Sequence, residues 1–206
     1  MADISVRRRP LLIVVSAPSG AGKTTLCDRL LSERKDIAYS ISCTTRKRRG
    51  NEVDGRDYHF LGKTEFDRLI KEGEFLEHAS VHGNMYGTLR RSVLEPLLNG
   101  LSVLMDIDVQ GAGQIRESLA DSPEDDLLRR GFVDIFVMPP SVDELRQRLE
   151  SRGEDSPETI AERIKNAESE MAEAKSYTYV VVNRDLEEAY DEFRRIIEGE
   201  QKRTVS

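Results

Sequence analysis

The chain has 206 residues, enough for one domain with insertions but too few for two independent enzymes. Its 31 Lys and Arg residues against 38 Asp and Glu give a formal net charge of −7, which argues against general binding to nucleic acid. Its 2 cysteines, Cys27 and Cys43, are too few for a disulfide framework and lack the spacing of metal ligands. We therefore expect a cytoplasmic protein with one modest hydrophobic core.

Residues 1–9 form a basic tail ahead of an apolar run at 11–15. A secretory signal needs about 7 to 15 apolar residues and a membrane span about 20, so this run is too short for either. It passes into a glycine-rich turn after Ser16, which is typical of a buried parallel strand. We expect no association with a membrane.

Short apolar runs rich in Val and Ile recur along the chain and predict central strands. They lie at 11–15, 101–105, 133–138 and 179–182. The segments between them have helical spacing, and in one of them Ser156 suits an N-cap and Pro157 the first turn. Strands that alternate with helices predict an α/β fold with a parallel sheet flanked by helices. We assign to this core residues 10–37, 89–140 and 173–206.

Two segments depart from this alternation. Residues 38–88 contain short β-rich pieces separated by turn signals at Asp54-Gly55 and Gly83-Asn84, which predict an inserted mixed-β lobe. Residues 141–172 are expected to form two charged helices with little apolar surface to anchor them. We expect this second segment to move as a helical lid.

A glycine-rich loop links the first predicted strand to a predicted helix, the order that a phosphate-binding P-loop requires. Its residues are Ala17, Pro18, Ser19, Gly20, Ala21, Gly22, Lys23, Thr24 and Thr25. Glycines let backbone N–H groups converge on phosphate oxygens, Lys23 is expected to bridge the β and γ phosphates, and Thr24 to bind Mg²⁺. Ala17 replaces the usual first glycine, and the alternative interpretation is a chance glycine turn before a helix.

Two acidic residues, Asp106 and Asp108, follow the next predicted core strand. The carboxyl end of this strand faces the phosphate loop in a parallel sheet, so Asp106 is expected to hold Mg²⁺ through water. The alternative for both residues is helix capping. The N-K-x-D pattern by which GTPases read guanine is absent from the sequence, which argues against a GTPase switch.

The segment 40–50 carries the densest positive charge in the chain and predicts a site for a substrate phosphate. Arg46 and Arg49 lie three positions apart, so in a tight turn both guanidinium groups are expected to converge on one phosphate. Lys47 and Arg48 are expected to face solvent. The alternatives are a solvated turn and a nuclear-localisation or RNA-binding patch, although the run itself lacks aromatic residues for base stacking.

Four residues of the predicted lobe have the chemistry of a purine pocket: Tyr58, Glu77, Tyr86 and Thr88. One carboxylate can accept both the N1–H and the N2–H of guanine, and a hydroxyl can satisfy O6, which suits Glu77 and Thr88. Adenine would place its N1 lone pair against that carboxylate. Each residue alone carries little weight, because an isolated Glu on a strand is usually solvated.

Six segments together resemble guanylate kinase, in the order and spacing of that family. They are SAPSGAGKTTL, SCTTRKRRGNEVDGRDYHF, FLEHASVHGNMYGT, LMDIDVQGAGQI, PPSVDELRQRLESRG and VVVNRDLEEAY. The resemblance implies a P-loop NTPase core with a GMP-binding lobe and a mobile lid. It also implies an enzyme that uses ATP and Mg²⁺ to convert GMP, and dGMP as a further acceptor, to the diphosphate in guanine nucleotide synthesis and recycling.

The resemblance further implies roles for single residues. The GMP phosphate is assigned to Ser42, Arg46, Arg49, Tyr58 and Tyr86, and the guanine to Glu77, Thr88 and Asp108. ATP, Mg²⁺ and the transferred group are assigned to the loop from Ala17 to Thr25, Asn183, Asp106, Arg148, Arg152 and Arg163. The implied catalytic residues are Lys23, Arg46 and the three lid arginines.

Three residues depart from the family pattern: Ala17, Cys43 and Arg48. The stretch Glu117 to Arg130 is also longer than the usual link. One rival hypothesis is a guanylate-kinase-like module that binds phosphorylated peptides without catalysis, but such modules tend to lose the phosphate loop that this chain keeps. Another is a kinase for a different nucleotide, and the sequence leaves the choice between monomer and homo-oligomer open.

Overall fold

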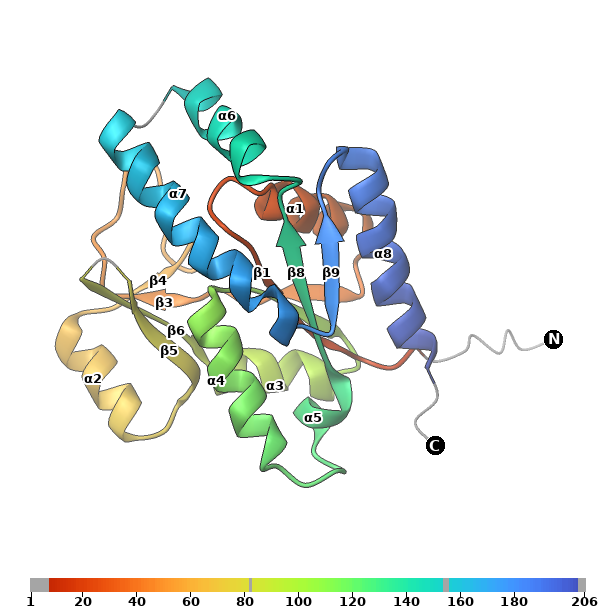
Figure 1. Cartoon of the computed structure of the whole chain (residues 1–206). Helices are drawn as coiled ribbons and strands as arrows, with labels where there is room; N and C mark the ends of the chain where they lie inside the picture. The colour runs from red at the N-terminus through yellow and green to blue at the C-terminus, as the bar shows by residue number, and fades with distance from the viewer. Residues whose placement is uncertain (1–7, 82, 154–155, 204–206) are drawn as a thin grey trace.

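A five-stranded parallel sheet forms the centre of the structure, in the strand order β2-β7-β1-β8-β9 (Figure 1). The computed structural model describes residues 8–81, 83–153 and 156–203, without the side chain of Arg152. The strands are β1 (Leu12–Ser16), β2 (Ile37–Tyr39), β7 (Ser102–Asp106), β8 (Phe132–Met138) and β9 (Tyr179–Val182). Every pairing in this sheet is parallel, which confirms the predicted α/β class.

The strand β2 is the one member of this sheet that the apolar runs did not predict. It has only three residues, Ile37, Ala38 and Tyr39, so its apolar run is shorter than those of the other four strands, and only Ile37 is buried. Ala38 pairs with Val103 of β7 at the edge of the sheet. The core sheet therefore continues to Tyr39, past the predicted core boundary at residue 37.

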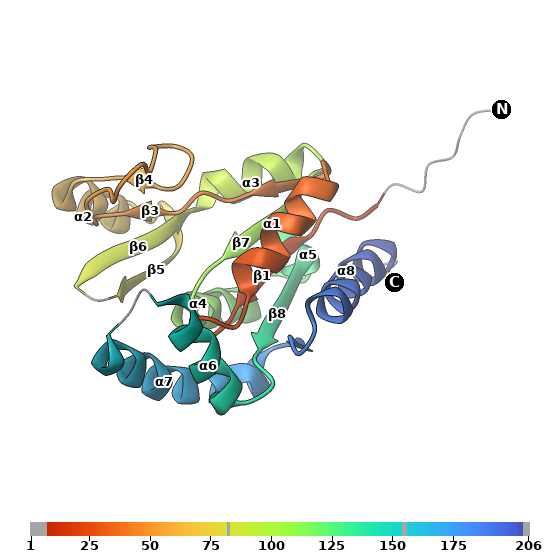
Figure 2. The ribbon, with the colours of Figure 1, turned by 90° about the horizontal axis from the view of Figure 1, so that it is seen from above.

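Helices cover both faces of the sheet. One face carries α1 (Lys23–Glu33) and α8 (Leu186–Lys202), and the other carries α3 (Arg90–Leu98), α4 (Val109–Ala120) and α5 (Leu127–Gly131) (Figure 2). Side chains along β1 alternate between the two faces, because Ile13 and Val15 join one hydrophobic cluster while Leu12 and Val14 join the other. These four side chains are fully buried, and each contributes about 1.5–3 kcal/mol of hydrophobic stabilisation. With both faces covered, the carboxyl edge of the sheet is where the fold can present a site.

The inserted lobe is built on a second sheet with the strand order β4-β3-β6-β5. Its strands are β3 (Cys43–Thr44), β4 (His59–Phe60), β5 (Phe75–Val81) and β6 (Asn84–Leu89). The pair β3–β4 is parallel, whereas β6 pairs antiparallel with both β3 and β5, which confirms the predicted mixed-β lobe. The helix α2 (Lys63–Lys71) closes one side, where Phe66 is fully buried and stacks on Phe75 with ring centroids 4.4 Å apart.

The two helices of the predicted lid are α6 (Val142–Arg152) and α7 (Pro157–Ala172), which is followed by the 3-10 turn η1 (Glu173–Ser176). Ser156 caps α7, as predicted, by accepting a hydrogen bond from the Thr159 N–H at 3.3 Å. The expectation of little apolar surface is wrong, because the two helices share a hydrophobic cluster of their own. Its buried members are Leu145, Leu149, Ile160, Ile164 and Ala167. In Figure 2 the lid and the lobe extend from the same side of the core.

The long stretch Glu117 to Arg130 contains the end of α4, a surface turn and the start of α5. Asp126 begins α5 by accepting hydrogen bonds from the N–H groups of Leu128 and Arg129 at 2.9 and 3.1 Å. The acidic run at 121–126 is thus a connection that ends in a helix cap. None of the helices in the described ranges is long and apolar enough to cross a membrane.

Candidate active site

A cavity of about 540 Å³ lies at the carboxyl edge of the core sheet, between the phosphate loop and the lobe. Its wall combines the loop after β1, the end of β7, the strands β5 and β6, and α7. The predicted site residues that line it are Ala17, Pro18, Ser19, Gly20, Gly22, Lys23, Thr24, Thr25, Ser42, Tyr58, Glu77, Tyr86, Asp106 and Asp108. The structure therefore brings residues from both predicted substrate sites to one cavity.

The phosphate loop turns on two glycines in the left-handed region. Gly20 has φ 95° and Gly22 has φ 93°, values that residues with a side chain rarely adopt. The helix α1 begins directly after Gly22, and no side chain caps its N-terminus. Its first N–H groups are thus open to an anion, and the helix dipole favours negative charge at the same point.

Asn183, at the end of β9, supports the phosphate loop from behind. Its Nδ2 donates to the carbonyl of Ala21 at 2.7 Å, and Asn183 is 5% exposed. A Cβ on Gly22 would lie 2.2 Å from the same Nδ2, so this close approach also requires glycine. Ala21 and Asn183, both predicted to bind ATP, lie outside the lining of the cavity and hold the shape of the loop.

Lys23 and Asp106 form an ion pair across the floor of the cavity, through Lys23 Nζ and Asp106 Oδ1. Thr24 lines the same cavity, so a hydroxyl and a carboxylate lie on one side of it. Hydroxyl and carboxylate oxygens suit Mg²⁺, which usually takes one or two carboxylates and completes its shell with water and substrate phosphates. Among the described residues no group of three or more His, Cys, Asp or Glu side chains could hold a metal alone. The residues present fit a metal that is shared with a nucleotide.

Glu77 is a buried carboxylate in the part of the cavity formed by the lobe. It is 5% exposed, and burial is the largest cause that raises its pKa to about 7. A hydrogen bond from Thr88 lowers the pKa of Glu77, and the nearby Asp108 carboxylate raises it further. The Thr88 hydroxyl is also 3.5 Å from the Ser42 hydroxyl. Glu77 and Thr88 are thus hydrogen-bonded neighbours, but only Glu77 lines the cavity, because Thr88 is fully buried, and their roles toward guanine stay predictions.

Asp108 combines the two interpretations offered for it. Its Oδ1 accepts a hydrogen bond from the Gly111 N–H at 2.8 Å and so caps α4, and the residue also lines the cavity. The backbone of α4 comes very close to the base pocket here, because a Cβ on Gly111 would lie 2.7 Å from Glu77 Oε2. The glycine allows helix and carboxylate to pack together.

Arg46 lies beside the cavity and points its guanidinium at Glu52. Nη1 and Nη2 donate to the two carboxylate oxygens at 3.0 and 2.8 Å. The backbone N–H of Arg49 donates to Glu52 Oε2 at 2.7 Å, and Arg49 itself is exposed. Glu52 thus joins the Arg46 side chain to the Arg49 backbone, and the convergence of both guanidinium groups on one phosphate stays a prediction.

Of the predicted lid arginines, Arg163 contacts the phosphate loop, and Arg148 contacts Asn183, which supports that loop. Arg163 Nη1 donates to the Ser19 hydroxyl at 2.9 Å. Arg148 Nη2 donates to Glu144 at 2.7 Å and to the carbonyl of Asn183 at 2.9 Å. The third, Arg152, has a side chain outside the described part of the structure. Arg148 and Arg163 are therefore near the loop but do not line the cavity.

Comparison with known proteins points to one family. A family model for guanylate kinase matches residues 8–200. The chain belongs to the guanylate kinase family. It is 51% identical over 187 residues to a guanylate kinase from Nitratidesulfovibrio vulgaris, a match that covers 91% of this chain and 86% of that protein. It is 48% identical over 195 residues to a guanylate kinase from Symbiobacterium thermophilum, covering 95% and 88%.

A solved guanylate kinase shares the fold. The crystal structure of guanylate kinase from Anaplasma phagocytophilum superposes with a TM-score of 0.74 at 37% identity, covering 96% of this chain and 89% of that one. The resemblance predicted from the six sequence segments is thus confirmed, together with the fold and the class of enzyme. Guanylate kinases are phosphotransferases that use ATP.

Sequence reasoning missed part of the guanylate kinase cavity. Its lining also includes Ala79, Val81, Gly87, Ile107 and Glu170. Glu170 is the charged member, and burial followed by the nearby Asp108 raises its pKa while Lys23 lowers it. Its position in the charged helix α7 resembles that of any solvated glutamate, and only the packing of α7 over the core brings it to the cavity.

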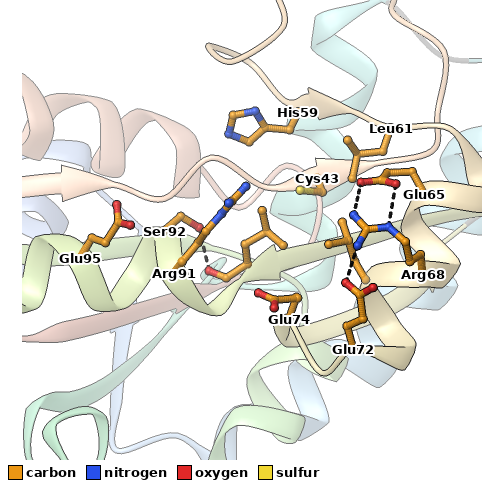
Figure 3. A pocket seen from close by; sticks show the side chains of 12 residues that line it. Cys43, His59, Leu61, Glu65, Arg68, Glu72, Glu74, Arg91, Ser92 and Glu95 are labelled. Carbon is orange, nitrogen blue, oxygen red and sulfur yellow. Dashed lines mark hydrogen bonds and ion pairs between the residues drawn. The ribbon is translucent and has the colours of Figure 1, made fainter.

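A second cavity of about 530 Å³ lies on the reverse side of the lobe (Figure 3). Cys43, His59 and Leu89 line it, each one position after a residue predicted to bind GMP, as expected from the alternation of side chains along a strand. Arg68 in its wall is paired with Glu65 at 2.6 Å and Glu72 at 2.5 Å. The predicted substrate residues lie on the other side of this sheet.

Proposed function

We propose that the protein transfers the γ-phosphoryl group of ATP to GMP, with dGMP as a second acceptor, giving ADP and the diphosphate. The observation that carries this proposal is one cavity lined both by the phosphate loop and by the buried carboxylate Glu77. One end suits a triphosphate and the other a guanine.

On the ATP side, the N–H groups of the loop and the side chain of Lys23 hold the β and γ phosphates. The Thr24 hydroxyl and the Asp106 carboxylate, the latter through water, would hold Mg²⁺, which supplies charge neutralisation on the phosphates when bound. When the nucleotide binds, Lys23 releases Asp106 and contacts the phosphates. The Asp106 carboxylate is then free to hold Mg²⁺ through water. Ala21 and Asn183 keep the loop in shape.

On the acceptor side, Glu77 accepts the N1–H and N2–H of guanine, while Thr88 and Asp108 complete the base pocket. Ser42, Arg46, Arg49, Tyr58 and Tyr86 bind the GMP phosphate. AMP is a poor substrate, because its N1 lone pair would leave a buried carboxylate without a donor. The energetic penalty of that unpaired group sets the specificity.

The chemistry requires alignment and charge neutralisation more than a base. The second pKa of a phosphate monoester is about 6, so the GMP phosphate is largely dianionic near neutral pH and is already a nucleophile. Lys23, Arg46, Arg148, Arg152 and Arg163 neutralise the charge that spreads over the migrating group. Closure of the lid excludes water that would hydrolyse ATP.

We place this activity in the cytoplasm, where ATP and guanine nucleotides are available. The two cysteines support this placement, because Cys27 and Cys43 are both free and buried. A reducing compartment suits free thiols.

A coupled assay of ADP release tests the proposed function with GMP, dGMP, AMP, CMP and UMP as acceptors. We expect turnover with GMP and dGMP that depends on Mg²⁺, and little with the others. Replacing Lys23 by Met should lower kcat by orders of magnitude while GMP still binds. Equal turnover of AMP and GMP would refute the assignment of the guanine pocket.

A further inference from the structure

The guanidinium of Arg46 is held mainly by Glu52, a residue that no site prediction included. Besides the two hydrogen bonds to the Glu52 carboxylate, Arg46 Nη1 donates to the carbonyl of Lys47 at 2.8 Å. Arg46 is only 9% exposed. A carboxylate that binds both terminal nitrogens of an arginine fixes the plane of the guanidinium as well as its position.

One edge of the guanidinium, which we call the available edge, is occupied by neither Glu52 nor Lys47; among the residues that the structure describes, its one further hydrogen-bond partner is the Tyr86 hydroxyl, which a phosphate would share or displace. An arginine has five N–H donors, and the three hydrogen bonds to Glu52 and Lys47 leave the N–H of Nε and one N–H of Nη2, which lie side by side. Hydrogen bonding to Glu52, and then to Tyr86, raises the pKa of Arg46, so Tyr86 lies near the guanidinium. The Tyr58 ring is 5.3 Å from Cζ of Arg46. Tyr58 and Tyr86 both line the cavity, whereas Arg46 does not, so the guanidinium lies next to the end of the cavity that these two residues form.

Glu52 is itself fixed by the loop that it closes. Its Oε2 accepts the Arg49 N–H at 2.7 Å, and its side chain is 23% exposed. Hydrogen bonds from Arg46 and then Arg49 lower the pKa of Glu52 to about 2, so it stays ionised at any assay pH. The Arg46–Glu52 pair is therefore neutral as a unit. What it offers a phosphate is a pair of oriented N–H donors rather than net charge.

We propose that Glu52 is a positioning residue for the phosphate of the monophosphate substrate: it orients Arg46 so that the available edge of the guanidinium binds that phosphate. The inference rests on the proposed function, since it presupposes a nucleoside monophosphate bound beside Tyr58 and Tyr86. The same contacts permit an opposite outcome, in which Glu52 competes with the phosphate for Arg46 and must be displaced.

Glu52→Gln separates these outcomes, because glutamine keeps the size of the side chain but offers a single acceptor oxygen. We expect KM for GMP to rise by roughly tenfold, as for the loss of one charge-assisted hydrogen bond that orients a ligand contact. KM for ATP should not change. The inhibition constant of guanosine should not change either, because guanosine carries no phosphate. Glu65→Gln is the matched control: it disrupts an Arg–Glu pair of similar length, 2.6 Å to Arg68, on the exposed surface of α2.

A double-mutant cycle identifies Arg46 as the residue through which Glu52 acts. Arg46→Ala alone should raise KM for GMP, and adding Glu52→Gln to it should have no further effect. Glu52→Asp keeps the charge but shortens the side chain, so it should give an intermediate KM and replaces Glu52→Gln if that variant does not fold.

Three results would overturn the inference while leaving the proposed function intact. They are an unchanged KM for GMP in Glu52→Gln, a lowered KM, which indicates competition, and an equal weakening of guanosine, which indicates collapse of the loop. Wild-type protein without GMP kinase activity would instead overturn the proposed function.

Discussion

The burial of Glu77 has a cost in stability. Its pKa is about 7 in the folded protein and 4.5 in the reference state, mainly because burial penalises the charged carboxylate. The folded protein thus holds this proton more tightly than the unfolded chain does. The neutral form of Glu77 therefore stabilises the fold fully at pH values below the pKa of the unfolded chain. This stabilisation is lost as the pH rises through the pKa of the folded protein. At a pH above the folded pKa, a shift of this size lowers the free energy of unfolding by about 3 kcal/mol.

Glu77→Gln should therefore stabilise the free protein at alkaline pH. Glutamine is neutral at every pH, so we expect the free energy of unfolding to rise by up to about 3 kcal/mol at pH 8 and much less at pH 5. Urea unfolding at the two pH values measures the difference. Glu74→Gln, at an exposed neighbouring position of the same lobe, serves as the control. An equal effect at both pH values would show that the charge of Glu77 is not the cause.

The same pKa predicts how base recognition depends on pH. Protonated Glu77 cannot accept both guanine donors, so the dissociation constant of guanosine should rise about tenfold per pH unit below a pH of about 7. Guanosine is the better probe than GMP, because the phosphate of GMP titrates near a pH of about 6. Competition assays between pH 5.5 and 8 measure this profile. The Glu77→Gln variant should bind weakly with a flat profile, and a sloping one would assign the titration to another group.

At the scale of helices and loops, the lid rests on the phosphate loop through apolar contacts. A Cβ on Gly20 would lie 3.0 Å from a methyl carbon of both Leu145 and Leu149, so α6 packs directly against the turn. The lid also has its own hydrophobic cluster. It should therefore move as one rigid unit around this contact rather than unfold when the nucleotides leave.

Hydrogen exchange across residues 141–172 tests this behaviour. Amides next to the internal cluster should be protected with and without a bisubstrate analogue, whereas those near Arg163 and the junction of α6 and α7 should gain protection when it binds. Arg152→Ala should lower kcat far more than it weakens GMP binding, with the exposed Arg146→Ala as control. A lid whose exchange does not respond to the analogue would contradict closure.

The features that could be predicted from the sequence are those encoded by residues close together in the chain. Continuous apolar runs identified the interior strands β1, β7 and β8, which are buried on both faces, and the edge strand β9, whose sequence is apolar although Val180 and Val182 are exposed. The other edge strand, β2, has only three residues and gave no comparable run. The phosphate loop was predictable because its glycines and Lys23 are consecutive. Glu52 and Glu170 were not, because each acquires its role from packing: one from a turn that folds back on Arg46, the other from a helix laid over the core.

At the scale of the whole molecule, core and lobe share the lining of one cavity, so a ligand there links two sheets. GMP at about 100 times its dissociation constant should stabilise the protein by about 2.7 kcal/mol. For a chain of this size, that corresponds to a rise in Tm of about 5 to 10 °C. Calorimetry should show one transition that moves as a whole, with AMP at equal concentration as control. Movement of only part of the transition would mean that the lobe unfolds separately.

The close packing of Gly111 against Glu77 has an evolutionary consequence. Because any side chain at position 111 would enter the space of the carboxylate, the two positions are not free to change separately. A bulkier residue at 111 would push the end of the Glu77 side chain out of its present position, and a shorter residue at 77 would relieve that conflict at the expense of the preference for guanine. The close approach of α4 thus couples position 111 to the residue that selects the base. In a related protein that prefers another base, we expect both positions to be replaced together.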